Sequence, residues 1–207
     1  MMRRGLLGLS LLTLAGTAPV RAQAAGELPP VGYGVLNQDQ VSVRFVAGDL
    51  EVRFIPLDER VLRLVAKDGY DALRGVLASR QPAIDSAAAA AGLAEPGLAL
   101  VSFFALRSDA RFDPENLTLL HRGQLYRPLA MVPVTGNFTG RQLNVRTQAS
   151  AVYLFEVPLP VFDGFDLAYA GIQSSVWNEA LRRIERARTQ VIARWQAEQN
   201  DSAARKP

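Results

Sequence analysis

The sequence predicts an α+β protein in which an antiparallel β-sandwich carries an inserted helical block and a long C-terminal amphipathic helix. Three observations support this class. Runs that alternate polar and apolar residues recur, and turn residues separate them at intervals of about 8 to 15 positions, as in antiparallel sandwiches. Residues 58–92 change to a helical period. The chain from Ser174 onward follows one long amphipathic pattern.

The first 24 residues have the order of a secretory signal peptide. Arg3 and Arg4 precede an uncharged apolar stretch at 5–18, and the small-residue run Ala22-Gln23-Ala24 follows. This order is typical of an export signal with an A-x-A cleavage site, and the apolar part is too short for a stable membrane span. The alternative is an N-terminal core helix. We therefore expect a bacterial protein exported to the periplasm or secreted, with no transmembrane span.

The formal charge is balanced once the predicted signal is removed. The chain has 23 Lys and Arg against 20 Asp and Glu, and Arg3, Arg4 and Arg21 belong to the predicted signal. Twenty basic and 20 acidic groups would remain. Nucleic-acid binders usually show a basic surplus, so we expect no nucleic-acid partner. The seven basic and four acidic residues from Ser174 onward indicate a basic C-terminal segment on a slightly acidic body.

The expected β-sandwich domain spans residues 41–173, after an extended lead-in at 25–40. The stretch "VSVRFVAGDLEVRFIPL" alternates polar and apolar residues on both sides of Ala47-Gly48-Asp49, which predicts a hairpin. The strongly apolar "LALVSFFAL" at 98–106 predicts a central strand. Further strands are expected in "RQLNVRT" (141–147), "SAVYLFEV" (150–157) and "FDLAYA" (165–170).

The helical insertion at 58–92 is expected to contain two or three helices. Asp58 is a suitable N-cap for the first turn. Pro82 fits the first turn of a separate helix, because proline is tolerated there, and Gly92 fits its end.

The C-terminal segment predicts one helix over 174–199, followed by a disordered tail at 200–207. We expect the helix to dock on the sandwich or on a second copy of the chain. A membrane-surface helix is the alternative, although such helices usually expose more apolar residues together. The apolar side of the helix consists of Trp177, Leu181, Ile184, Val191, Ile192 and Trp195.

The stretch "LTLLHRGQLYRPL" at 117–129 contains the single histidine, His121. We expect a hairpin with its turn at Arg122-Gly123-Gln124 and an exposed, structural His121 beside the turn. Leu117, Leu119 and Leu125 are expected to face the interior. We predict a possible contact surface that consists of Tyr126, Arg127, Trp177 and Trp195.

The sequence contains few residue patterns that are typical of metal binding, phosphate binding or catalysis. Without cysteine, and with one histidine, the chain lacks the ligands of a typical zinc site and cannot form disulfides. The segment "SDARFDPEN" lacks the glycine and the spacing of a calcium loop. No phosphate-binding glycine loop and no G-x-S-x-G nucleophile elbow is present. We therefore predict no catalytic residue, no metal site and no cofactor.

The order of motifs between Leu98 and Tyr169 resembles that of secreted bacterial immunoglobulin-like domains of the MPT63-like type, which include uncharacterised lipoproteins. The motifs are "FDPENLTLL", "GQLYRPL", "YLFEVP" and "DLAY", and the resemblance covers about residues 98–170. It implies an immunoglobulin-like β-sandwich with an extracytoplasmic adhesion, binding or assembly role. The helical block at 58–92 and the C-terminal helix depart from that pattern, as does the absence of a lipid-bearing cysteine.

Three functions follow as expectations. The first is a non-catalytic extracytoplasmic binding or protein-interaction domain, whose small-molecule ligand, if it has one, is unknown. The second is an envelope structural subunit that assembles with a protein partner or with itself through its C-terminal helix. The third is a hydrolase that uses an acid pair without a recognisable motif, since two carboxylates far apart in sequence can meet in space.

Overall fold

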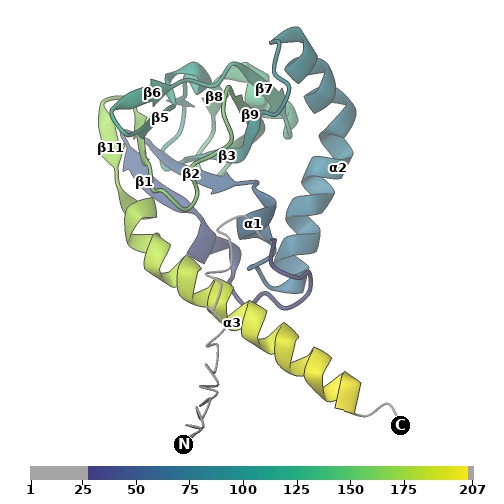
Figure 1. The fold of residues 1–207 in the computed structure, drawn as a ribbon. Helices are drawn as coiled ribbons and strands as arrows, with labels where there is room; N and C mark the ends of the chain where they lie inside the picture. The colour runs from purple at the N-terminus through teal and green to yellow at the C-terminus, as the bar shows by residue number, and fades with distance from the viewer. Residues whose placement is uncertain (1–27, 205–207) are drawn as a thin grey trace, which may run out of the picture.

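The structure is a computed structural model that describes residues 28–204. The predicted signal peptide, the first residues of the lead-in and the last three residues of the chain lie outside the described residues. Figure 1 shows strands layered in the upper part of the molecule, with one long helix along their side and another beneath them.

Most strands belong to two antiparallel sheets. The five-stranded sheet has the order β1-β2-β3-β9-β7, and the four-stranded sheet has the order β11-β10-β5-β6. The strands of the first are β1 (Val43–Ala47), β2 (Leu50–Pro56), β3 (Gly97–Ala105), β9 (Gln148–Phe155) and β7 (Ala130–Pro133). Those of the second are β11 (Ile172–Ser174), β10 (Asp166–Tyr169), β5 (Thr118–His121) and β6 (Gln124–Tyr126). The short strands β4 (Ala110–Arg111) and β8 (Gln142–Leu143) form a separate pair.

The predicted first hairpin and central strand are confirmed. β1 pairs with β2 across the turn at Gly48, and β3 lies between β2 and β9. The expected strand at 141–147 is reduced to the two residues of β8. The strand β11, directly before the C-terminal helix, was not predicted, because its three residues are too few to show a period.

An aromatic core joins the two sheets. Phe103 of β3 lies with its ring centroid 5.3 Å from that of Tyr169 of β10, and Phe54 of β2 lies 5.7 Å from Phe165. Phe103 and Phe54 are fully buried. Burying a phenylalanine side chain contributes about 1.5–3 kcal/mol, so these contacts help to hold the two sheets together. The arrangement is mixed α and β, with several antiparallel sheets and a C-terminal helix, and it is compatible with a β-sandwich.

The helical block contains α1 (Glu59–Leu62) and α2 (Lys67–Ala90). The Asp58 side chain accepts a hydrogen bond from the backbone N–H of Arg60, so the predicted cap is confirmed. The expected second helix beginning at Pro82 is wrong, because Pro82 lies inside one continuous helix. α2 packs on β7 and β9, where Leu73, Leu77 and Ile84 are buried, and this packing outweighs the cost of the proline.

The C-terminal helix α3 spans Val176–Ala204. It therefore continues beyond the expected end near Gln199, and residues 200–204 are helical rather than a disordered tail. α3 runs beneath the strands and contacts β1, β10 and the 3₁₀ turn η1 (Gln38–Val41) (Figure 1). Two further 3₁₀ turns, η2 (Pro114–Asn116) and η3 (Gly136–Gly140), lie in the loops.

Candidate functional site

The buried side of α3 fixes this helix to the body. Trp177 is fully buried, its ring stacks on Phe165 at 5.1 Å, and its Nε1 donates a hydrogen bond to the carbonyl of Val161 at 3.1 Å. The buried stripe continues along the helix with Ala180, Ile184, Ala187 and Val191. The prediction that Trp177 belongs to a contact surface is therefore wrong. A single indole at the start of an amphipathic helix gives the same sequence signal whether it is core or surface.

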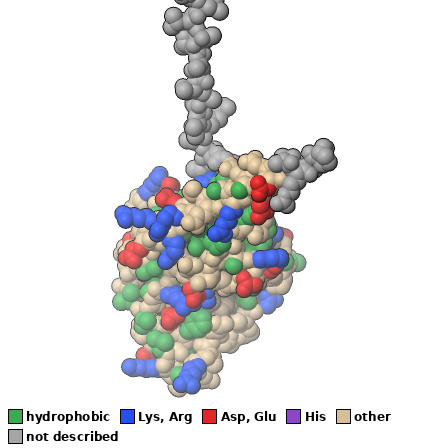
Figure 2. All heavy atoms as spheres, turned by 90° about the horizontal axis from the view of Figure 1, so that it is seen from below, with side chains coloured by type: hydrophobic (Ala, Val, Ile, Leu, Met, Phe, Trp, Pro, Cys, Tyr) green, Lys and Arg blue, Asp and Glu red, His purple; other side chains and the backbone are tan. Residues whose placement is uncertain are grey.

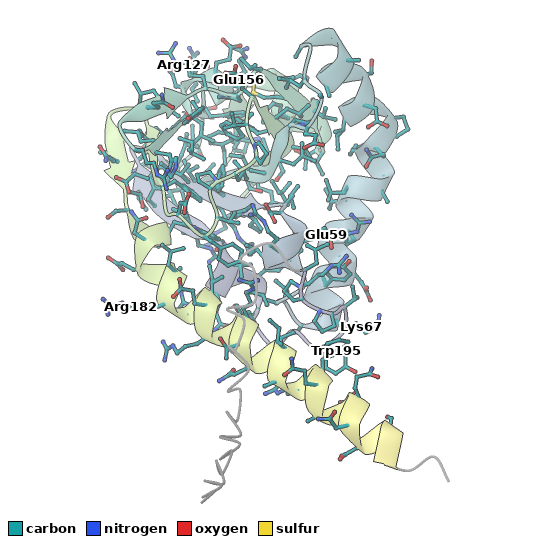
Figure 3. All side chains as sticks on the ribbon, in the orientation of Figure 1. Glu59, Lys67, Arg127, Glu156, Arg182 and Trp195 are labelled. Atoms are coloured by element: carbon teal, nitrogen blue, oxygen red, sulfur yellow. The ribbon has the colours of Figure 1, made fainter. Side chains whose placement is uncertain are left out.

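The opposite side of α3 is basic and open to solvent. Arg182, Arg183, Arg186 and Arg194 are all exposed, and within residues 28–204 none of them forms an ion pair with a carboxylate. We call these four residues the α3 basic face. Figure 2, which views the molecule from below, shows several basic side chains on this side with acidic ones between them, and Arg182 points away from the strands in Figure 3.

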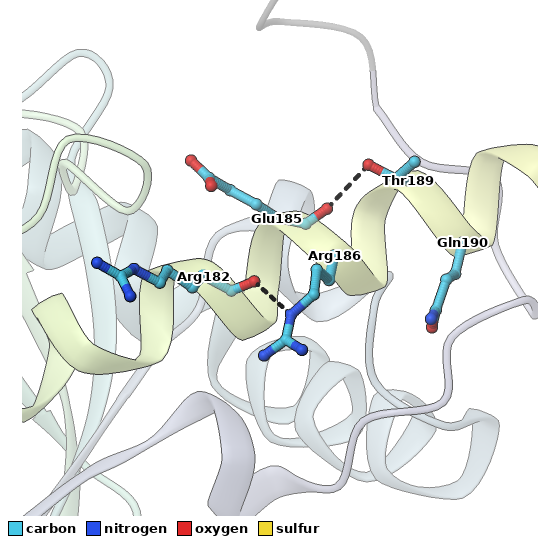
Figure 4. A pocket seen from close by; sticks show the side chains of 5 residues that line it. All are labelled: Arg182, Glu185, Arg186, Thr189 and Gln190. Atoms are coloured by element: carbon cyan, nitrogen blue, oxygen red, sulfur yellow. Dashed lines mark hydrogen bonds between the residues drawn. The ribbon is translucent and has the colours of Figure 1, made fainter.

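The backbone of α3 holds part of this face in place. Arg186 Nε donates to the carbonyl of Arg182 at 3.1 Å, which orients the guanidinium along the helix, and its terminal nitrogens stay open to solvent. Arg182 and Arg186, with Glu185, Thr189 and Gln190, also line a shallow hollow (Figure 4). A guanidinium donates hydrogen bonds in a planar fork that fits carboxylates and phosphates. The α3 basic face can therefore bind a partner with clustered negative charge.

Trp195 continues the buried stripe of α3 at the point where the helix leaves the body. Its side chain is 36% exposed, and every residue from Ala193 to Ser202 is exposed. The Tyr33 hydroxyl donates to Glu198 at 2.6 Å, and this hydrogen bond raises the pKa of Tyr33. The last turns of α3 thus touch the lead-in segment through Tyr33, while Trp195 is one of the exposed large hydrophobic residues.

The hairpin that carries His121 contacts the loop at residues 163–164. The His121 imidazole is half-buried, and its Nδ1 lies 2.7 Å from the carbonyl of Gly164. A carbonyl oxygen only accepts hydrogen bonds, so Nδ1 carries the proton. Arg122 pairs with Asp163 at 3.1 Å. The expectation of a freely exposed histidine is therefore corrected, while its structural role agrees with these contacts.

A hollow of about 350 Å³ lies between this hairpin, the 163–166 loop and the start of α3. Its polar groups already have partners, since Asp166 accepts from Asn178 at 2.7 Å and from Gln173 at 2.8 Å. Gly164 has φ +81°, and a Cβ at that position would lie 2.3 Å from Asn178 Oδ1. The close packing indicates that these contacts hold the hairpin, the 163–166 loop and the start of α3 together, and it does not favour a ligand site.

The remaining predicted contact residues lie apart. Tyr126 ends the edge strand β6 and is half-buried, and Arg127 follows it, exposed. Arg127 lies at the opposite end of the molecule from Trp195 (Figure 3). Leu125, expected in the interior, is 66% exposed. Its register partner Leu120 lies on the outer face, because Leu119 and Tyr126 occupy the alternate, inward positions.

Residues 28–204 contain no group of three or more His, Cys, Asp or Glu side chains that could hold a metal ion. None of their helices is both long and apolar enough to span a membrane.

Fold and surface together define a class: a mixed α and β protein with antiparallel sheets, whose docked C-terminal helix presents arginines to solvent. Comparison of the chain with protein-family models, curated proteins and solved structures finds no match in any of the three. The α3 basic face was not predicted as a unit, although the spacing of Arg182, Arg186 and Arg194 at multiples of four was visible in the sequence.

Proposed function

We propose that this chain is a non-catalytic, extracytoplasmic interaction domain that binds an acidic protein partner through the α3 basic face. The observation that carries the proposal is that its four arginines are exposed and, within residues 28–204, form no ion pair, on a helix whose other side is buried in the core. The immunoglobulin-like character of the sandwich and export of the chain belong to the same proposal. The fold compatible with a sandwich and the order of the first 24 residues support them.

The repulsion between neighbouring arginines on α3 lowers the stability of the helix, so folding stability does not explain why these charges are there. Arg182 and Arg186 are four residues apart, and like charges at this helical spacing cost about 0.2–0.5 kcal/mol. Glu179 and Glu185 are close in sequence but form no ion pair with the four arginines within residues 28–204. An acidic partner would compensate these charges.

The geometry favours a protein partner over a nucleic acid. Arg182 to Arg194 span about 18 Å along the helix at 1.5 Å per residue, which matches three or four turns of an acidic helix. The balanced charge expected for the processed chain lacks the overall basic surplus that nucleic-acid binders usually have.

Charge reversal tests the proposal. Tagged protein carrying Arg182→Glu, Arg183→Glu and Arg186→Glu would be compared with wild type in affinity purification from the envelope of its own bacterium, followed by mass spectrometry. The matched control reverses three other exposed arginines, Arg107, Arg111 and Arg146. We expect a partner with an acidic surface that wild type and control retain and the α3 variant loses, as does wild type in high salt. Recovery of the same proteins by the α3 variant would refute the proposal, and so would recovery of no partner by wild type.

A second candidate function, an envelope structural subunit, is favoured by the helical extension beyond Trp195. Residues 193–202 of α3 are all exposed, so these turns offer a surface to a partner or to a second copy of the chain. Removal of residues 197–207 would then change the oligomeric state or the partner set in light scattering and pull-down. An unchanged state would exclude this second function.

A further inference from the structure

A second cluster of arginines lies on the five-stranded sheet, separate from the α3 basic face. Arg44 of β1 and Arg53 of β2 are register partners, so their side chains lie on the same face. That face is the outer one, because Phe54 and Val43, next to them in sequence, are buried on the inner side. Both guanidinium groups therefore project together from neighbouring strands.

One carboxylate oxygen serves both arginines. Nη2 of Arg53 lies 2.8 Å from Oδ1 of Asp39, and Nη2 of Arg44 donates to the same oxygen. Asp39 comes from η1, a different element from the two strands. Two cations thus share a single acceptor atom. Glu51 is the next acid along β2, and within residues 28–204 it forms no ion pair with either arginine.

Arg53 is incompletely satisfied. Its side chain is 18% exposed, and its Nε is buried without a hydrogen-bond partner. Burial, followed by the repulsion of Arg44, lowers the pKa of Arg53. A buried, unpaired guanidinium N–H is costly, and an acceptor with two or three oxygens would satisfy it better than one carboxylate oxygen does.

The Asp39 side chain is not needed to hold its own turn. The side chain of Asn37 accepts from the backbone of Gln40, and the side chain of Gln40 accepts from the backbone of Asn37, which closes a capping box around η1. Ser42 Oγ donates to the backbone carbonyl of Asp39. The Asp39 side chain is 60% exposed, so it can rotate into solvent while η1 stays folded.

We propose that Arg44 and Arg53 form a binding site for an oxyanion, a carboxylate or a phosphate group, and that Asp39 occupies this site as an internal substitute when no ligand is bound. The oxyanion displaces the Asp39 carboxylate and spans the two Nη2 groups that this carboxylate now bridges. The ligand is either a small free anion or an acidic side chain of a peptide, since both present the same oxygens.

Removal of the internal competitor gives the main test. The variant Asp39→Asn deletes the negative charge and keeps the side-chain size. Isothermal titration calorimetry with inorganic phosphate should show at least tenfold tighter binding to Asp39→Asn than to wild type. The matched control is Asp49→Asn, which frees Arg107 from an exposed ion pair that contains only one arginine. The control should bind phosphate no better than wild type.

The arginines and the ligand source are tested in the same assay. Arg53→Gln in the Asp39→Asn background should abolish the gain, while Arg53→Lys should retain part of it, and circular dichroism would establish that both are folded. A tetraglutamate peptide that binds Asp39→Asn more tightly than phosphate does would assign the site to acidic peptides, and the reverse order would assign it to free anions. Equal phosphate affinity of Asp39→Asn and Asp49→Asn would overturn the proposal. The α3 charge-reversal variant should keep this site, so the two proposals can fail separately.

Discussion

The indole of Trp177 donates a hydrogen bond to the backbone carbonyl of Val161 at 3.1 Å, within a fully buried contact between α3 and the loop that precedes β10. This bond links the start of α3 to a loop 16 residues earlier in the chain. It fixes where α3 begins and which side of the helix faces solvent. The α3 basic face therefore depends on the packing of one tryptophan.

Replacement of Trp177 should show this dependence. We expect Trp177→Ala to lower the free energy of unfolding by about 3–5 kcal/mol, because it leaves a cavity beside Phe165 and an unpaired carbonyl on Val161. Trp177→Phe should cost less, because it retains most of the packing. The measurement is urea unfolding followed by circular dichroism. Trp195→Ala is the control, with an expected loss under about 1.5 kcal/mol since the side chain is partly exposed. Equal losses for the two alanine variants would contradict the assignment of Trp177 to the core.

The turn between β10 and β11 offers a stabilising substitution. Ala170 has φ +48° and Gly171 has φ +79°, as in the two-residue turns that favour Asn-Gly. We expect Ala170→Asn to raise the free energy of unfolding by about 0.5–1 kcal/mol, because asparagine tolerates the left-handed region better than alanine. Thermal and urea unfolding would measure the gain. The same change at Arg122, with φ +49°, should give less, since it also removes the ion pair with Asp163. A loss of stability for Ala170→Asn would disprove this account of the turn.

Pro82 should destabilise the helix that contains it. It has no backbone N–H and lies exposed in the interior of α2. Pro82→Ala should therefore raise the free energy of unfolding by about 1–3 kcal/mol, the range expected when an interior helix position regains its hydrogen bond. Ser86→Ala, one turn further along the exposed side, is the control and should change stability by under about 0.5 kcal/mol. Urea unfolding followed by circular dichroism would measure both variants. An unchanged unfolding midpoint for Pro82→Ala would contradict a destabilising effect of the proline.

Alkaline pH should weaken the core through its tyrosines. Burial raises the pKa of Tyr153, and nearby Tyr169 and Asp113 raise it further; burial also raises the pKa of Tyr169. An unfolded tyrosine ionises near pH 10. Above that pH the unfolded state loses the Tyr153 proton before the folded state does, so the free energy of unfolding should fall by up to about 1.4 kcal/mol per pH unit, and Tyr169 adds to this fall in the same direction. Below about pH 10 this contribution is fully present.

Urea unfolding of wild type and Tyr153→Phe between pH 8 and 11 would measure this effect. The variant should be less stable at pH 8, because the hydrogen bond from the Tyr153 hydroxyl to the Pro114 carbonyl, at 3.0 Å, is lost. Its stability should nevertheless fall less steeply above pH 10. Parallel curves for the two proteins would show that Tyr153 does not contribute to the alkaline loss.

The parts predicted correctly from the sequence are those that local patterns specify. The β1–β2 hairpin follows from alternation around Gly48, the central strand β3 from an unbroken apolar run, and the cap of α1 from Asp58. Gly92, with φ +70°, ends the segment after α2 as its position suggested. In each case the residues that carry the signal lie within a few positions of one another.

The sequence by itself determined the alternation of strands, the helical block, the amphipathic C-terminal helix and the lack of a typical zinc-ligand set. The tertiary structure decided that α2 continues through Pro82, that Leu125 faces outward and that Trp177 lies in the core. It also brought Asp39 to Arg44 and Arg53 and left the four arginines of the α3 basic face without carboxylate partners among the described residues. The physical reason is that a side chain's environment depends on which distant segment packs against it, and a local period contains no information about that segment.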